Sequence, residues 1–139
     1  MRLKFGFALL GFLALTGPAP AGEAKKAAVH KVTQSKSYLM VDPIYATIVA
    51  NDRPIGLLMV GVGLDVSDEA LRADADRAMP VLRDGYVRSL MSFAATAVRA
   101  SEQPDVALIA ERLQRVTDKI MHRKGARVLL AQVAMRLTH

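Results

Sequence analysis

Apolar side chains at every second position between residues 55 and 66 constrain the fold of this chain more than any other feature of its sequence. The side chains of a β-strand point to opposite faces in turn, so this alternation predicts a strand that is buried on one face only. The opposite face carries Gly61 and Gly63, which indicate a bulge or the close approach of another backbone. The buried face is predicted to hold Leu58, Val60, Val62, Leu64 and Val66.

A second strand is predicted just before it, over residues 38–50, where β-branched and aromatic residues are common. Pro43 interrupts this segment and has no backbone N–H to donate, so we expect an edge strand or two short strands with a break. The residue types of segment 51–54 indicate a turn, and the two strands are predicted to pair as a hairpin. One face of the first strand is expected to hold Ile44, Ala46, Ile48 and Ala50.

Beyond residue 66 the apolar spacing changes to the three- and four-residue steps of one helix face. Ser67 is predicted to cap this helix, with Asp68 and Glu69 in the first turn, where the positive end of the helix dipole favours anions. Pro80 lies inside the pattern and removes one backbone hydrogen bond, so it should kink the helix or split it into two pieces. The apolar stripe consists of Leu71, Ala75, Ala78, Leu82, Tyr86, Leu90, Phe93 and Ala97.

Segment 100–104 breaks the helical pattern, and a second helix is predicted from about Asp105 to Lys124. Basic residues in its last turn suit the negative end of the dipole, and Gly125 supplies the stop. A final strand is predicted over residues 126–137. The helix stripe is Val106, Ile109, Leu113, Val116 and Ile120, and one face of the strand is expected to hold Ala131, Val133, Met135 and Leu137.

These elements together predict an α+β fold with the order β-β-α-α-β. Strands on both sides of a helical block imply one antiparallel or mixed sheet with two long helices on one face. The sequence shows no internal repeat and no second domain. We therefore expect one α+β domain over residues 38–139.

The first 21 residues contain the three parts of a secretory signal peptide in order. Arg2 and Lys4 form a positive start, residues 5–15 are apolar, and residues 19–21 form a small-x-small cleavage site. The apolar segment is too short for a bilayer span, which takes about 20 residues. We expect cleavage and a periplasmic or secreted protein. The alternative is an uncleaved segment that tethers the protein to the inner membrane.

Residues 22–37 are polar and basic, and we expect them to form a flexible leader, most simply a solvated tail. The alternative is a peripheral contact of the leader lysines with anionic lipid of the inner membrane. The whole chain has a formal net charge of +6, and removal of Arg2 and Lys4 lowers it to +4. The remaining charges alternate in sign along the helices, so we expect no nucleic-acid partner.

No combination of residues indicates catalysis. Cysteine is absent, which excludes a disulfide and a thiolate nucleophile. The three histidines, His30, His122 and His139, have no metal-binding spacing, and His122 suits the C-terminal end of a helix, where cations are favoured. The serines stand in no G-x-S-x-G turn, and the carboxylates lie near arginines or helix starts. The sequence therefore predicts a non-enzymatic protein, without metal or cofactor, that acts by contact.

From Tyr38 onward the chain resembles the flagellar basal-body-associated FliL family. The resemblance covers residues 38–137 and depends on the order and spacing of several short features. These are Tyr38-Leu39 and Pro43, the segment GLLMVGVGLDVSDEAL that leads from a strand into an acid-capped helix, Pro80 with Leu82-Arg83-Asp84, Leu90, the amphipathic helix from Asp105, and the final apolar strand.

The resemblance implies a small periplasmic domain, similar to the stomatin-type SPFH domain, that associates with copies of itself and contacts the flagellar stator to support motility. The matching proline-then-arginine/aspartate segment makes Pro80, Arg83, Asp84 and Arg88 the candidate interaction surface. Two features depart from the family pattern. A cleavable signal replaces the usual membrane helix, and the last strand lacks the usual aromatic residues. The alternative is a periplasmic binding or envelope-associated module unrelated to motility.

Overall fold

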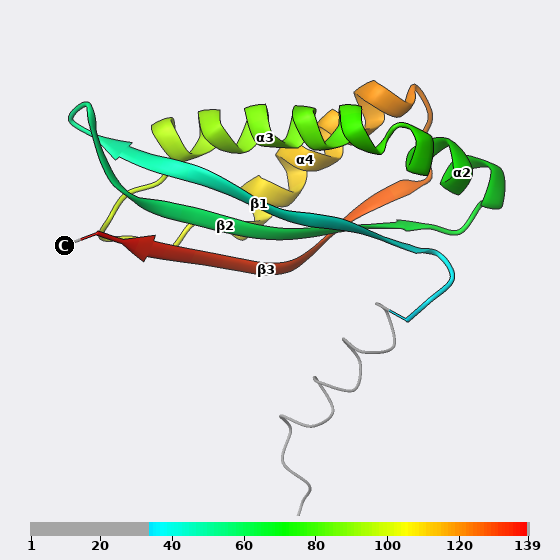
Figure 1. The fold of residues 1–139 in the computed structure, drawn as a ribbon, viewed down its shortest axis with the longest axis horizontal. Coiled ribbons are helices and arrows are strands. Elements are labelled where there is room, and N and C mark those ends of the chain that lie inside the picture. The colour runs from blue at the N-terminus through cyan, green and yellow to red at the C-terminus, as the bar shows by residue number, and fades with distance from the viewer. Residues whose placement is uncertain (1–33, 139) are drawn as a thin grey trace, which may run out of the picture.

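The computed structural model describes residues 34–138, which form an α+β fold (Figure 1). In chain order its elements are β1 (Tyr38–Ala50), β2 (Arg53–Val66), α2 (Glu69–Arg77), α3 (Met79–Thr96), α4 (Val106–Met121) and β3 (Ala126–Leu137). The strands form one antiparallel sheet in the order β1-β2-β3. In Figure 1, α3 runs along β1 and α4 crosses the strands obliquely. The predicted fold class is confirmed, whereas the predicted signal peptide and leader residues 22–33 lie outside the described residues.

The predicted element order is wrong, because the described residues follow β-β-α-α-α-β. The segment predicted as one helix divides at Ala78, which ends α2 and precedes α3. Pro80 then lies in the first turn of α3, where an N–H has no intrahelical acceptor and its absence costs little. Of the two outcomes expected for Pro80, a kink or a split of the helix, the structure shows the split.

Aspartates cap two of the helices. Asp68, not the predicted Ser67, caps α2 by accepting a hydrogen bond from the backbone N–H of Leu71 at 2.6 Å. Asp105 accepts a bond from Leu108 N–H at 2.9 Å at the start of α4. Aspartate and serine are similarly good caps, so the residue types at 67 and 68 do not distinguish the two positions.

The hairpin between β1 and β2 is confirmed, with a two-residue loop at Asn51 and Asp52. Both residues have positive φ, 50° and 60°, which Asn and Asp tolerate better than most residues. Such a loop has the twist that joins two antiparallel strands without splaying them. β2 therefore begins at Arg53, before the predicted residue 55.

Gly61 is the point at which both neighbouring strands are irregular. Asp42 and Pro43 of β1 together lie opposite Gly61, and β3 has one extra residue, Ala131, beside it. Each bulge moves the core-facing positions of its strand by one residue. Ala131 is therefore exposed, contrary to the prediction for β3, whereas Val133, Met135 and Leu137 pack against the core. The bulge expected from the glycines is confirmed.

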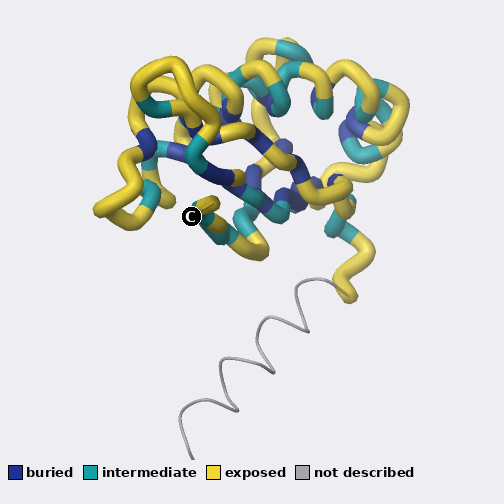
Figure 2. The backbone as a smooth tube through the Cα atoms, turned by 60° about the vertical axis from the view of Figure 1, so that its left-hand side comes forward, coloured by how far each residue is buried: buried dark blue, intermediate teal, exposed yellow. Residues whose placement is uncertain are grey.

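The core lies between the sheet and the helices, where Figure 2 shows the buried residues. The predicted buried face of β2 is confirmed, as are Ile44, Ala46 and Ile48 of β1. On the helices, the main buried side chains are Leu71, Leu82, Tyr86, Leu90, Phe93, Ile109, Leu113, Thr117 and Met121.

Two predictions for the helices are wrong, namely the burial of two stripe residues and the end of α4. Val106, the first residue of α4, is 49% exposed, and Ala97, which follows the last residue of α3, is also exposed. α4 ends at Met121 rather than Lys124, because His122 adopts a left-handed conformation with φ 52°. The predicted stop, Gly125, has φ 121° and lies in the connection to β3 instead.

Candidate interaction surfaces

The structure places the four residues of the candidate interaction surface on α3, in two directions. Pro80, Asp84 and Arg88 are exposed and four residues apart, so they form one line along the outer side of the helix. Asp84 and Arg88 pair at 2.5 Å. Arg83 is half-buried and turns toward the sheet. The surface predicted from sequence is thus a line of three residues with Arg83 on its flank.

Arg83 connects α3 to the bulge of β1. Its guanidinium donates a hydrogen bond to the carboxylate of Asp42 at 2.8 Å, across 41 positions of the chain. Both side chains are substantially exposed, so the pair contributes roughly 0.2–1 kcal/mol. Arg83 therefore has a structural role in addition to its place beside the predicted surface.

The sheet face away from α3 and α4 is a second surface, and its apolar character was not predicted. We call it the open face. Its exposed apolar side chains include Met40 at 76%, Tyr45 at 55% and Leu57 at 40% exposure. The open face comprises Met40, Tyr45, Thr47, Val49, Leu57, Met59, Gly61, Gly63, Leu129, Gln132, Ala134 and Arg136, together with the end row Tyr38, Asp65 and Arg127.

A sequence signal for this surface does exist. In a sheet with one face in water, buried apolar residues normally alternate along each strand with polar residues that point outward. Here Tyr45, Leu57 and Met59 occupy outward positions instead. Tyr45, Met59 and Ala134 are direct neighbours across the three strands, as are Thr47, Leu57 and Arg136. The strand register therefore gathers apolar residues from distant parts of the chain into one patch.

Charges on the open face lie at its two ends. At one end Arg127 donates a hydrogen bond to Asp65 at 2.9 Å, between paired positions of β2 and β3. At the other end, near the hairpin, lies Arg136. The ring of Tyr38 covers Gly63 so closely that a Cβ there would overlap it. The middle of the face thus carries no charged side chain from the described strands, and Gly61 leaves part of it without a side chain.

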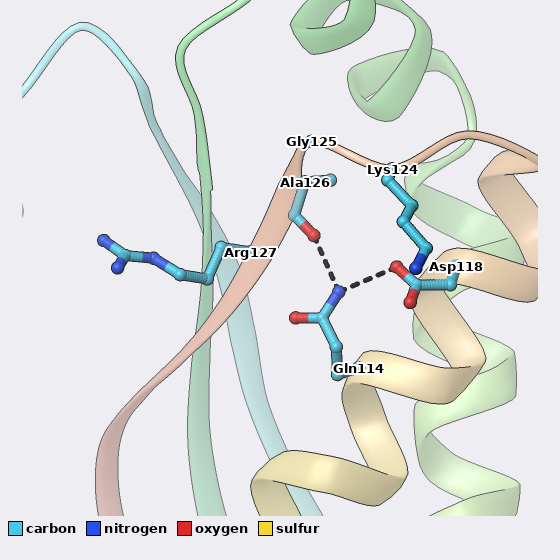
Figure 3. Close-up of a pocket in the computed structure, with 6 residues that line it drawn as sticks. All are labelled: Gln114, Asp118, Lys124, Gly125, Ala126 and Arg127. Carbon is cyan, nitrogen blue, oxygen red and sulfur yellow. Dashed lines mark hydrogen bonds between the residues drawn. The ribbon is translucent and has the colours of Figure 1, made fainter.

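A shallow depression of about 220 Å³ lies where α4 meets the start of β3 (Figure 3). Gln114 dominates it: its amide nitrogen donates to the Ala126 carbonyl at 2.9 Å and to Asp118 at 2.8 Å, and its amide oxygen accepts from Val128 N–H at 2.8 Å. Arg127 points away from Gln114 in Figure 3. The amide of Gln114 pairs with β3 as a neighbouring strand would, so we interpret this region as structural.

The described residues offer few groups for chemistry. In residues 34–138 no three His, Asp or Glu side chains are grouped so that they could hold a metal ion. His122 is exposed at the end of α4, and His30 and His139 lie outside the described part. Tyr86 is buried, and burial raises the pKa of its phenol. Its partner is Thr117, a hydroxyl and not a base.

No helix within residues 34–138 has the length and apolar content needed to cross a bilayer. The chain was also compared with protein-family models and with curated proteins, and it matches none of them.

Proposed function

We propose that this protein is a non-enzymatic contact protein of the bacterial cell envelope, similar to the FliL family, that associates with the stator or basal body of the flagellar motor and supports motility. The proposal includes export through the N-terminal segment, self-association, and a fold of the stomatin-type SPFH kind. The observation that carries the contact role is the open face. An apolar patch exposed on a folded domain is typical of a protein-binding surface.

The positions of the FliL-like residues support the same proposal. Pro43 belongs to the bulge of β1, Asp68 caps α2, and Pro80 begins α3. Each of these residues has a structural role that depends on its place in the order of elements. The line of Pro80, Asp84 and Arg88 remains exposed on α3 and is the surface that we propose for the motor component.

A swimming assay on a deletion strain tests the motility role. We expect smaller swimming zones, restored by the wild-type chain, and a tagged copy located at flagellar bases. A chain with Asp84→Arg and Arg88→Glu exchanges the charges of an exposed pair while keeping both partners, so a loss of swimming there would report on contact rather than folding. Normal swimming of the deletion strain with uniform envelope distribution would refute the motility role.

The second candidate is an envelope module unrelated to motility, favoured by the signal-like segment in place of a membrane helix. Affinity capture from detergent-solubilised envelopes separates the two candidates. Recovery of stator or basal-body proteins supports the first. Recovery of other envelope components without them supports the second.

A further inference from the structure

We propose that the open face is the contact between two copies of this chain, packed sheet against sheet around a two-fold axis that lies between the two sheets and runs across the strands near Gly61. This inference specifies the self-association that belongs to the proposed function. A sheet with one apolar face must cover that face, and two such sheets pack about 10 Å apart with interleaved side chains. The helices already cover the other face of each sheet.

The size of the face suits a dimer. Strands of 12 to 14 residues, three abreast, give an area of roughly 600 Å² per copy from the usual strand spacings. Two copies would together bury roughly 1,200 Å², which is the lower end of specific protein interfaces. The face is therefore large enough to hold a dimer of moderate affinity without help from other surfaces.

The shape of the face matches itself under this symmetry. Along β2, the half near the hairpin carries Leu57 and Met59, and the other half carries Gly61 and Gly63. A two-fold axis at right angles to the strands places the large half of each copy over the small half of the other. Met59, two residues from the axis, then meets the ring of Tyr38 that covers Gly63 of the other copy, a pairing of sulfur and aromatic ring that is favourable.

The charges are compatible with the same arrangement. Asp65 is the one carboxylate among the strand positions of the open face, and it lies at the opposite end from Arg136. The two-fold axis brings Arg136 of each copy to the end that holds Asp65 and Arg127 of the other. Each end of the interface would then contain one carboxylate and two guanidinium groups.

The sheet edges are less suited to the contact. Pro43 and its bulge interrupt β1, and the amide of Gln114 already pairs with the start of β3. Interrupted or occupied edges are the usual means by which proteins prevent strand addition. The open face, with its exposed apolar side chains, is therefore the more suitable contact.

The test is the mass in solution of the protein made from the full chain, measured by sedimentation over a concentration series. We expect a reversible dimer that Leu57→Glu converts to a monomer, weakening association at least 100-fold, while circular dichroism stays unchanged. Met91→Glu is the matched control, since Met91 is 54% exposed but lies on α3, and it should leave the dimer intact.

A cysteine at the axis provides a second readout, because the chain has no native cysteine. A Cβ at Gly61 has no contact shorter than 3.4 Å, so Gly61→Cys should fold. Two Cα atoms about 10 Å apart are too far from each other for a direct disulfide, so a short bismaleimide crosslinker should join the two thiols of the dimer, unlike those of Met91→Cys. A wild-type monomer at all concentrations, or a dimer that survives Leu57→Glu, would overturn the proposal. So would Leu57-dependent binding of the monomer to phosphatidylglycerol vesicles, which would assign the face to lipid. A monomer would leave the motility role intact, because the swimming assay tests that role separately.

Discussion

The phenol oxygen of Tyr86 lies 2.7 Å from the hydroxyl oxygen of Thr117, in the core between α3 and α4. Thr117 uses its own proton in a 2.9 Å bond to the Leu113 carbonyl, so Tyr86 must be the donor of the shared bond. This relay joins the two helices that cover the sheet. It also explains how a polar residue, Thr117, is fully buried in the described core.

Tyr86→Phe is expected to destabilise the protein by about 1 kcal/mol, because Thr117 loses a donor while the aromatic packing remains. Tyr45→Phe is the matched control, since Tyr45 is 55% exposed on the open face, and it should change the stability little. Urea unfolding followed by far-ultraviolet circular dichroism measures both. Equal stabilities for the two variants would show that the buried bond contributes nothing.

The Tyr86 phenol also predicts how stability depends on alkaline pH. Burial raises the pKa of this group in the folded state, so the folded protein holds the proton more tightly than the unfolded chain does. The stabilising contribution is complete below about pH 10 and is lost as the pH rises through the folded pKa. Unfolding free energies should fall less steeply above about pH 10 in Tyr86→Phe than in the wild type. Parallel curves would contradict this prediction.

Two glycines on the same face of β2 should respond differently to alanine. At Gly63 a Cβ would overlap the Tyr38 ring, so Gly63→Ala should displace the ring and cost about 1 kcal/mol. At Gly61 the nearest atom to a Cβ is 3.4 Å away, so Gly61→Ala should be neutral or slightly stabilising. In a Tyr38→Ala background the cost at Gly63 should disappear. Thermal unfolding of the wild type, of Gly63→Ala, of Tyr38→Ala and of the double variant gives the coupling between Tyr38 and Gly63 directly.

Gln114→Ala should leave Ala126 C=O and Val128 N–H without partners on the side of β3 away from β2. A part-buried pair of unsatisfied backbone groups costs about 1–3 kcal/mol. The newly open edge should also increase aggregation on mild heating, measured by turbidity. Gln103→Ala is the control, because Gln103 is exposed in the loop before α4. If the two variants aggregate and unfold alike, Gln114 does not protect the edge.

Much of the architecture follows from local patterns. The bounds of β1 and β3 match those predicted, and the alternating positions of β2 identify its buried face correctly. These predictions succeed because a strand with one buried face must alternate, whichever elements cover it. Gly61 and Gly63 also indicated a bulge, and Pro43 indicated that β1 is an edge strand, since missing side chains and a missing N–H have local consequences.

The rotation of α4 illustrates where local patterns are insufficient. The predicted stripe included Val116 and Ile120, whereas the fully buried line runs through Ile109, Leu113 and Thr117. Val116 and Ile120 are only half-buried, and both contact α3 at Gly85 while they pack against the edge of the core. A helix that contacts two surfaces has apolar residues on two sides. The sequence pattern does not show which side packs against the sheet and which against the neighbouring helix.

The candidate surfaces also depend partly on local sequence patterns and partly on contacts between distant segments. The sequence alone determined the strand and helix periods and the position of the turn after residue 50, and it named Pro80, Arg83, Asp84 and Arg88 as a candidate surface. Only the tertiary structure decided that Arg83 reaches Asp42, that Gln114 pairs with β3, and that the apolar outward residues of three strands form one patch. The physical reason is that periodicity depends on neighbours a few positions apart. Register and helix docking depend on contacts between distant segments, and these form only when the whole core packs.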